Sequence, residues 1–156
     1  MILIKNFTRN KFDRKYLDKV AERTLRVIEI KKSVEISLVI AGEKRIRLLN
    51  KKFRGINKTT DVLSFGNEEA ENKKAENRFG KSAKFINPPG DVLYLGEIFI
   101  CYPQAEKQAK QKNHSIKQEM AILLIHGILH LAGFDHKEEY EKSEMKIIET
   151  KVLKSL

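Results

Sequence analysis

The sequence has a single cysteine and no long apolar run, and both absences narrow the kinds of protein it can be. Cys101 is the only cysteine among 156 residues, so the chain cannot form an internal disulfide. Its apolar runs are far shorter than the roughly 20 residues of a membrane span. The first residues, MILIK, offer four apolar residues before a lysine, whereas a secretory signal needs an apolar stretch of roughly 7 to 15. We therefore expect a cytoplasmic protein that does not contact a membrane.

The composition is that of a globular protein, with 41% hydrophobic and 33% charged residues. A chain of this length is large enough to bury a substantial core. It also suits one folding unit. We expect a single domain that spans residues 1–156.

The positive charge is concentrated in the first part of the chain. The formal net charge is +10; residues 1–58 carry 17 Lys and Arg against 6 Asp and Glu, and residues 59–156 carry 14 against 15. A basic surface attracts polyanions, because each neutralised phosphate releases counterions. Nucleic acid is the natural partner, although a basic surface that serves only solubility has the same composition.

Hydrophobic periodicity predicts strands at 1–8, 34–40, 61–65 and 91–101, and helices at 12–30, 43–53 and 103–112. Another helix is expected after the Ser115 cap, and a last one at 137–156. Residues 67–90 are polar and turn-rich, which indicates a flexible loop or extended hairpin. The direct run from 61–65 to 91–101 permits an antiparallel pair. We predict an α/β (α+β) fold, with a mixed sheet of about four strands, the last well inside it, packed by about five helices.

The segment HGILHLAGFDH, residues 126–136, contains three of the four histidines. His126 and His130 are one helical turn apart and project from one face. Gly133 can adopt a left-handed conformation that ends the helix, so that His136 folds back toward them. Three neutral imidazoles with an open fourth position suit a catalytic zinc ion. We predict that these three histidines bind one Zn²⁺.

The other candidate ligands are weaker. The predicted strand position of Cys101 has no sequence link to the histidines, and His114, which precedes the Ser115 cap, is expected to be an ordinary surface residue.

The helix predicted at 43–53 also has an end signal. Gly55 follows it at the position where a glycine in the left-handed conformation would end the helix.

The spacing of the histidines and Gly133 also matches the zinc motif of metzincin proteases. Those enzymes have a catalytic glutamate after the first histidine, whereas this chain has Gly127. Peptide hydrolysis would lack its best-placed base. A phosphodiester suits the site better, because a metal can polarise a phosphoryl oxygen and stabilise the developing charge.

Four blocks of sequence resemble the YbeY-type endoribonucleases, the bacterial rRNA maturation factors. They are LNKKFRG at 49–55, TDVLSF at 60–65, LGEIFI at 95–100 and HGILHLAGFDH at 126–136. Phe134 replaces a tyrosine of the family pattern, Glu97 an aspartate and Gly66 a proline. The 67–90 segment is longer than the usual connection.

The resemblance implies that His126, His130 and His136 bind zinc and that Arg54 is the functional arginine near the metal. A guanidinium suits this position because its planar fork binds phosphate bidentately. Asp135 either orients an imidazole and shuttles protons, or caps the turn after Gly133.

The resemblance further implies a zinc-dependent endoribonuclease that cleaves single-stranded RNA in 16S rRNA 3′-end maturation and ribosome quality control. Expected partners are rRNA and the ribosome or its small-subunit proteins, and DNA is not expected as a substrate. A non-catalytic ribosome-associated or RNA-binding factor with a structural zinc is the alternative.

Overall fold

The computed structural model describes residues 2–30, 33–66, 92–134 and 139–156. The predicted 67–90 loop or hairpin therefore lies outside the described residues. The described elements follow in the order β1 (Ile2–Asn6), α1 (Arg14–Val27), β2 (Val34–Ala41), α2 (Glu43–Arg54), β3 (Val62–Gly66), β4 (Leu93–Cys101), α4 (Tyr102–Gln111), α5 (Ile116–Leu131) and α6 (Glu139–Lys154). The predicted α/β class is confirmed.

The described strands form a single mixed sheet in the order β1-β2-β4-β3. β1 pairs parallel with β2, and β2 pairs parallel with β4. β3 runs antiparallel to β4. The predicted antiparallel pair and the inner position of the last strand are both confirmed, and β3 lies at an edge of the sheet.

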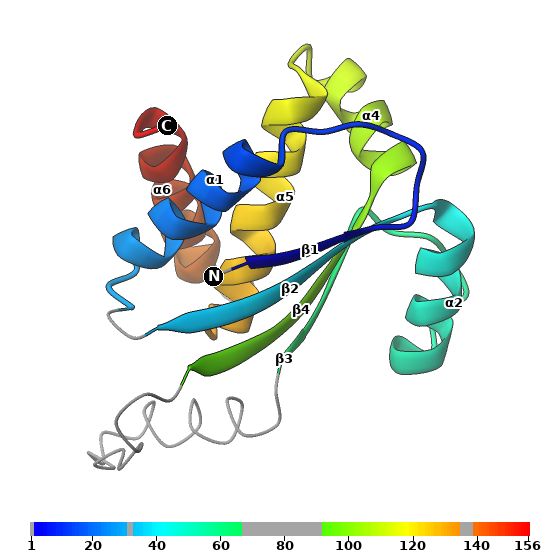
Figure 1. Ribbon diagram of the computed structural model, residues 1–156, viewed down its shortest axis with the longest axis horizontal. Coiled ribbons are helices and arrows are strands. Elements are labelled where there is room, and N and C mark those ends of the chain that lie inside the picture. Colours follow the sequence, from blue (N-terminus) through cyan, green and yellow to red (C-terminus); the bar gives the residue numbers. More distant parts are fainter. Residues whose placement is uncertain (1, 31–32, 67–91, 135–138) are drawn as a thin grey trace.

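The two faces of the sheet are covered by different helices, as Figure 1 shows. Alternate β2 residues such as Ile36, Leu38 and Ile40 join the main core with residues of α1, α5 and α6. On the other face, Leu63 and Cys101 pack with Ile46 of α2 in a smaller cluster. The histidine helix α5 and the basic helix α2 therefore lie on opposite faces of the sheet.

The ends of the helices follow their capping residues. Asp13 caps α1 by accepting a hydrogen bond from the Tyr16 amide at 3.0 Å. Gly55 ends α2 with φ of 70°, the left-handed conformation expected there. In the part of the chain that the structure describes, no helix has the length and apolar character needed to span a bilayer.

Candidate metal centre

The helix α5 is the central element of the core and positions two of the three predicted ligands. It begins at the Ser115 cap, whose Oγ accepts a hydrogen bond from the Gln118 amide at 3.1 Å. Most of its side chains are buried, whereas His126 and His130 are only partly buried. Because α5 is fixed by its core contacts, the two imidazoles are held on a rigid helix.

The imidazoles of His126 and His130 converge. Their Nε2 atoms are 3.1 Å apart, and their ring planes lie at 77° to each other with centroids 4.6 Å apart. Two nitrogens bound to one tetrahedral zinc, each about 2.0 to 2.1 Å from the ion, are separated by about 3.3 Å. The spacing of this pair therefore fits two ligands of one zinc ion.

The helix ends as the sequence predicted. Gly133 has φ of 95°. Its amide donates to the His130 carbonyl at 2.9 Å, and the Phe134 amide donates to the Leu129 carbonyl at 2.9 Å. This pair of bonds is the Schellman arrangement, which ends a helix and turns the chain away from its axis. Phe134 packs against the main core and fixes the turn.

The remaining predicted site residues of this segment, Asp135 and His136, lie outside the described residues. Among the residues that the structure does describe, no group of three His, Cys, Asp or Glu could hold a metal ion. The three-histidine ligand set therefore stays a prediction. The structure describes two of its members, His126 and His130.

Gly127, which directly follows His126, faces the sheet. A Cβ atom added at Gly127 would lie 2.8 Å from Cγ2 and 3.0 Å from Cδ1 of Ile98 in β4. The contact between helix and strand therefore leaves no room for a side chain. The missing glutamate of the protease motif has a structural reason, since position 127 points into the core and away from the imidazoles.

Comparison with known proteins identifies the family. The model of the family described as Endoribonuclease YbeY matches residues 3–156. The chain belongs to the YbeY family.

Two curated YbeY endoribonucleases illustrate the similarity. The protein of Dehalococcoides mccartyi is 43% identical over 133 residues, which cover 84% of this chain and 74% of that protein. The protein of Clostridium perfringens is 37% identical over 167 residues, covering 100% of this chain and 96% of its own. The solution structure of TM1509 from Thermotoga maritima has the same fold, with a TM-score of 0.61, 29% identity and coverage of 98% of this chain and 87% of that chain.

Arg54, the arginine of the segment LNKKFRG, belongs to α2, which lies on the face of the sheet opposite the histidine helix. It is the last residue of α2 and is exposed. The ring of the preceding residue, Phe53, contacts Phe65 of β3 with centroids 5.0 Å apart. The structure thus brings His126 and His130 together, and it places Phe53, the residue before Arg54, against β3 on the opposite face.

The C-terminal end of α5, which carries the histidines, lies near the last residues of β3. Gly96 of β4 lies opposite Gly66, the last residue of β3. A Cβ atom added at Gly96 would meet the Phe65 carbonyl oxygen at 2.2 Å and Cδ2 of Leu131 at 3.0 Å. Leu131 directly follows His130, so the histidine helix and the Arg54 helix approach one end of β3 from its two faces.

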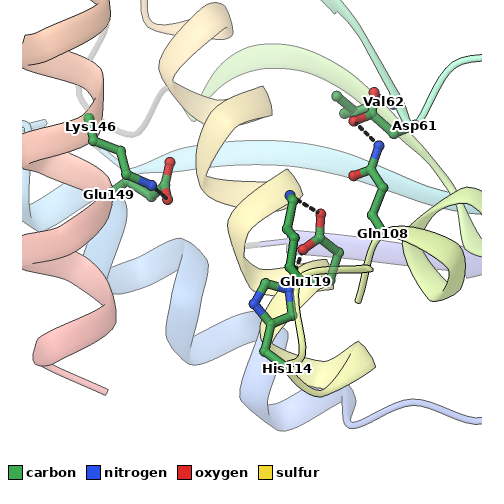
Figure 2. Close-up of polar contacts among 8 residues, drawn as sticks. Asp61, Val62, Gln108, His114, Glu119, Lys146 and Glu149 are labelled. Atoms are coloured by element: carbon green, nitrogen blue, oxygen red, sulfur yellow. Dashed lines mark hydrogen bonds and ion pairs between the residues drawn. The ribbon is translucent and has the colours of Figure 1, made fainter. Parts of the chain in front are cut away.

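Asp61, in the YbeY motif TDVLSF, has a structural role. Its Oδ1 accepts a hydrogen bond from the Val62 amide at 2.8 Å, and its Oδ2 accepts one from Nε2 of Gln108 at 3.0 Å, as Figure 2 shows. The Asp61 carbonyl accepts a further bond from the Cys101 amide at 2.8 Å. The carboxylate therefore ties β3 to α4.

Cys101 is not placed to join the histidines. It is buried in the cluster on the α2 face, beside Ala41 and Leu63. Burial raises the pKa of its thiol, which disfavours the thiolate that binds metals.

The prediction that His114 is an ordinary surface residue is wrong. Its side chain is 16% exposed, and its Nε2 contacts Oε2 of Glu119, which is fully buried (Figure 2). Nζ of Lys112 donates to the other oxygen of Glu119 at 2.9 Å. The burial of Glu119 explains the arrangement, because a buried carboxylate needs charged or hydrogen-bonding partners.

Proposed function

We propose that this protein is a zinc-dependent endoribonuclease that cleaves single-stranded RNA in the cytoplasm. Its role would be 16S rRNA 3′-end maturation and ribosome quality control, with the ribosome or small-subunit proteins as partners. The observation that carries the proposal is the convergence of the His126 and His130 imidazoles, whose Nε2 atoms are 3.1 Å apart. It is supported by the relatives, which are named endoribonucleases.

His126, His130 and His136 would hold the zinc. A bound zinc would polarise a phosphoryl oxygen and lower the pKa of a water molecule to about 7. The histidines must be neutral to bind a metal, so binding weakens as the pH falls.

Arg54 would bind the phosphate backbone close to the cleaved bond. It lies exposed at the end of α2, and its planar guanidinium can bind a phosphate through two hydrogen bonds. A strand of RNA that passes over the edge strand β3 would contact Arg54 on one side and the histidines on the other. An unpaired strand bends around such an edge more readily than a duplex does, which favours single-stranded RNA as the substrate.

The nucleophile is either water or the 2′-hydroxyl of the RNA. No side chain at position 127 can act as a base, because that position faces Ile98. Asp135 would either move protons and orient an imidazole, or cap the turn after Gly133. The product ends distinguish the two nucleophiles: a 5′-phosphate indicates water, and a 2′,3′-cyclic phosphate indicates the hydroxyl.

The test compares RNA cleavage by the wild-type protein and by His130→Ala, matched for folding by circular dichroism. His114→Gln is the control, since it changes a histidine outside the candidate centre and keeps a donor for Glu119. We expect cleavage of an unstructured RNA by the wild type and the control, and a loss of at least about 10- to 100-fold in His130→Ala, since the loss of a hydrogen-bond partner of a metal ligand alone costs that much. Equal residual cleavage by all three proteins would overturn the proposal.

The same samples test the alternatives. A protein that binds zinc and RNA without cleaving RNA would be the non-catalytic factor with a structural zinc. Hydrolysis of unfolded casein that a chelator stops would indicate the protease, which the contact of Gly127 with Ile98 disfavours.

A further inference from the structure

The helix α2 carries a stripe of positive charge. Six of its 12 residues are Lys or Arg and one is acidic. Lys44, Arg47, Lys51 and Arg54 follow one another at intervals of three, four and three residues, a spacing that places them on one side of a helix. All four are exposed. We call these four residues the α2 stripe.

The first half of the α2 stripe lines a groove of about 670 Å³ between α2 and residues 57–59. Lys58 adds a further cation to the lining. Nε of Arg47 donates to Oδ1 of Asn57 at 2.9 Å, which holds the guanidinium beside the groove. Glu43 is the one acidic residue of the lining, and its Oε1 accepts a hydrogen bond from Nε2 of Gln104 at 2.9 Å. The groove therefore has a net positive charge.

The second half of the stripe lies at the end of α2 that contacts β3. Arg54 ends the helix next to Phe53, whose ring contacts Phe65 of β3. The histidine end of α5 approaches the same end of β3 from the other face. A chain molecule that lies along the stripe and continues beyond Arg54 would reach the edge of the sheet next to the histidines.

We infer that the α2 stripe binds successive phosphates of a single-stranded RNA and guides the strand over the β3 edge to the histidines. The stripe is about 15 Å long, from about ten helical steps of about 1.5 Å between Lys44 and Arg54. A stripe of this length can contact more than one phosphate of a single strand, and its cations would release the counterions of those phosphates. Contacts of this kind position a strand and do not read its sequence. The delivery of the strand for cleavage rests on the proposed function.

The opposite side of the same helix provides a matched control. Arg45 lies over the ring of Phe7, 4.1 Å from its centroid. Lys52 lies 5.3 Å from the ring centroid of Phe53. Both are exposed cations of α2, but their spacing places them on a side of the helix away from the groove.

The experiment compares two double variants that remove the same charge from the same helix, K44Q/K51Q in the stripe and R45Q/K52Q on the control side. Binding of a fluorescein-labelled, unstructured 12-nucleotide RNA is measured by anisotropy from 50 to 300 mM salt, in a chelator. Cleavage is measured separately with zinc present. Circular dichroism and urea unfolding verify that both variants are folded.

The stripe variant should lose the contacts to two phosphates. For a single strand, the slope of log K against log salt should then fall by about 1.4, and the Kd at 0.1 M salt should rise about 25-fold. In the cleavage assay KM should rise and kcat should stay within about 2-fold. The reason is that the lost contacts hold the substrate equally well in the ground state and in the transition state. The control variant should change the Kd by less than about 3-fold, since it alters only the overall charge.

Equal weakening of binding in the two variants would overturn the inference, as would a wild-type protein that does not bind the RNA. A wild-type protein that binds the RNA and does not cleave it would contradict the proposed function alone. The comparison of the two variants in the binding assay would still decide whether the stripe is the contact surface.

Discussion

Gly127 of the histidine helix packs directly against Ile98 of the central strand β4. A Cβ atom at position 127 would lie 2.8 Å from Cγ2 of Ile98, closer than side chains in folded proteins approach. The glycine allows the helix to lie deep on the sheet, and the positions of His126 and His130 depend on that depth.

Gly127→Ala should destabilise the fold. In an exposed helix interior, alanine is favoured over glycine by about 1 kcal/mol, but here the added methyl overpacks a fully buried contact, which costs about 1 to 3 kcal/mol. Urea unfolding measures the change. In an Ile98→Ala background, Gly127→Ala should leave the free energy of unfolding unchanged or raise it. The same loss of stability in that background would show that Ile98 is not the obstacle.

Glu119 should be important for stability through its two partners. Its side chain is fully buried, and it contacts Lys112 and His114. Glu119→Gln should lower the free energy of unfolding by about 1.5 to 3 kcal/mol, the usual contribution of hydrogen bonds to a charged group.

Glu106→Gln is the control for this substitution. Glu106 pairs with Lys110 at 3.9 Å, and both side chains are more than half exposed. The control should change the free energy of unfolding by less than about 0.5 kcal/mol. Similar effects of the two substitutions would contradict the assigned role of the buried carboxylate.

Asp13 should make the stability of the protein depend on acidic pH. A hydrogen bond from Lys117 and another from the Tyr16 amide hold the pKa of this carboxyl below its ordinary value of 3.8. Since the folded pKa is the lower one, the contribution is complete above the unfolded pKa and is lost as the pH falls from about 4 through the folded pKa.

Urea unfolding between about pH 5 and pH 2 tests this dependence. Asp13→Asn keeps the acceptor that caps α1 and removes the charge, so its stability should fall less steeply with acid than that of the wild type. Lys117→Gln removes the partner and should have a similar effect. Identical pH profiles for all three proteins would refute the assignment.

Local signals in the sequence predicted the parts of the site that depend on neighbouring residues. The spacing of His126 and His130 predicts that their side chains share a face, and Gly133 predicts the end of the helix, because both features depend on helical geometry alone. The Ser115 cap was predictable for the same reason. The antiparallel pairing of β3 with β4 was also foreseen, since two strands that follow each other without a helix between them can pair antiparallel.

Contacts between distant segments could not be predicted in this way. The packing of Gly127 on Ile98 depends on how deeply α5 lies on the sheet, and the sequence of either segment alone does not record it. Periodicity gives no information on which face of the sheet a helix covers, so the position of Arg54 across β3 from the histidines was not predictable. His114 was misassigned because its environment is determined by a buried carboxylate on the following helix.

A titration of metal-free protein with zinc tests whether the histidines hold a catalytic metal ion. The initial rate of cleavage of an unstructured RNA is measured at each addition. We predict no cleavage without metal, a rate that rises in proportion to zinc and reaches a plateau at about one equivalent, and no rise in His130→Ala. Full cleavage by the metal-free protein, or the same zinc dependence in His130→Ala, would show that the histidines do not hold a catalytic zinc ion.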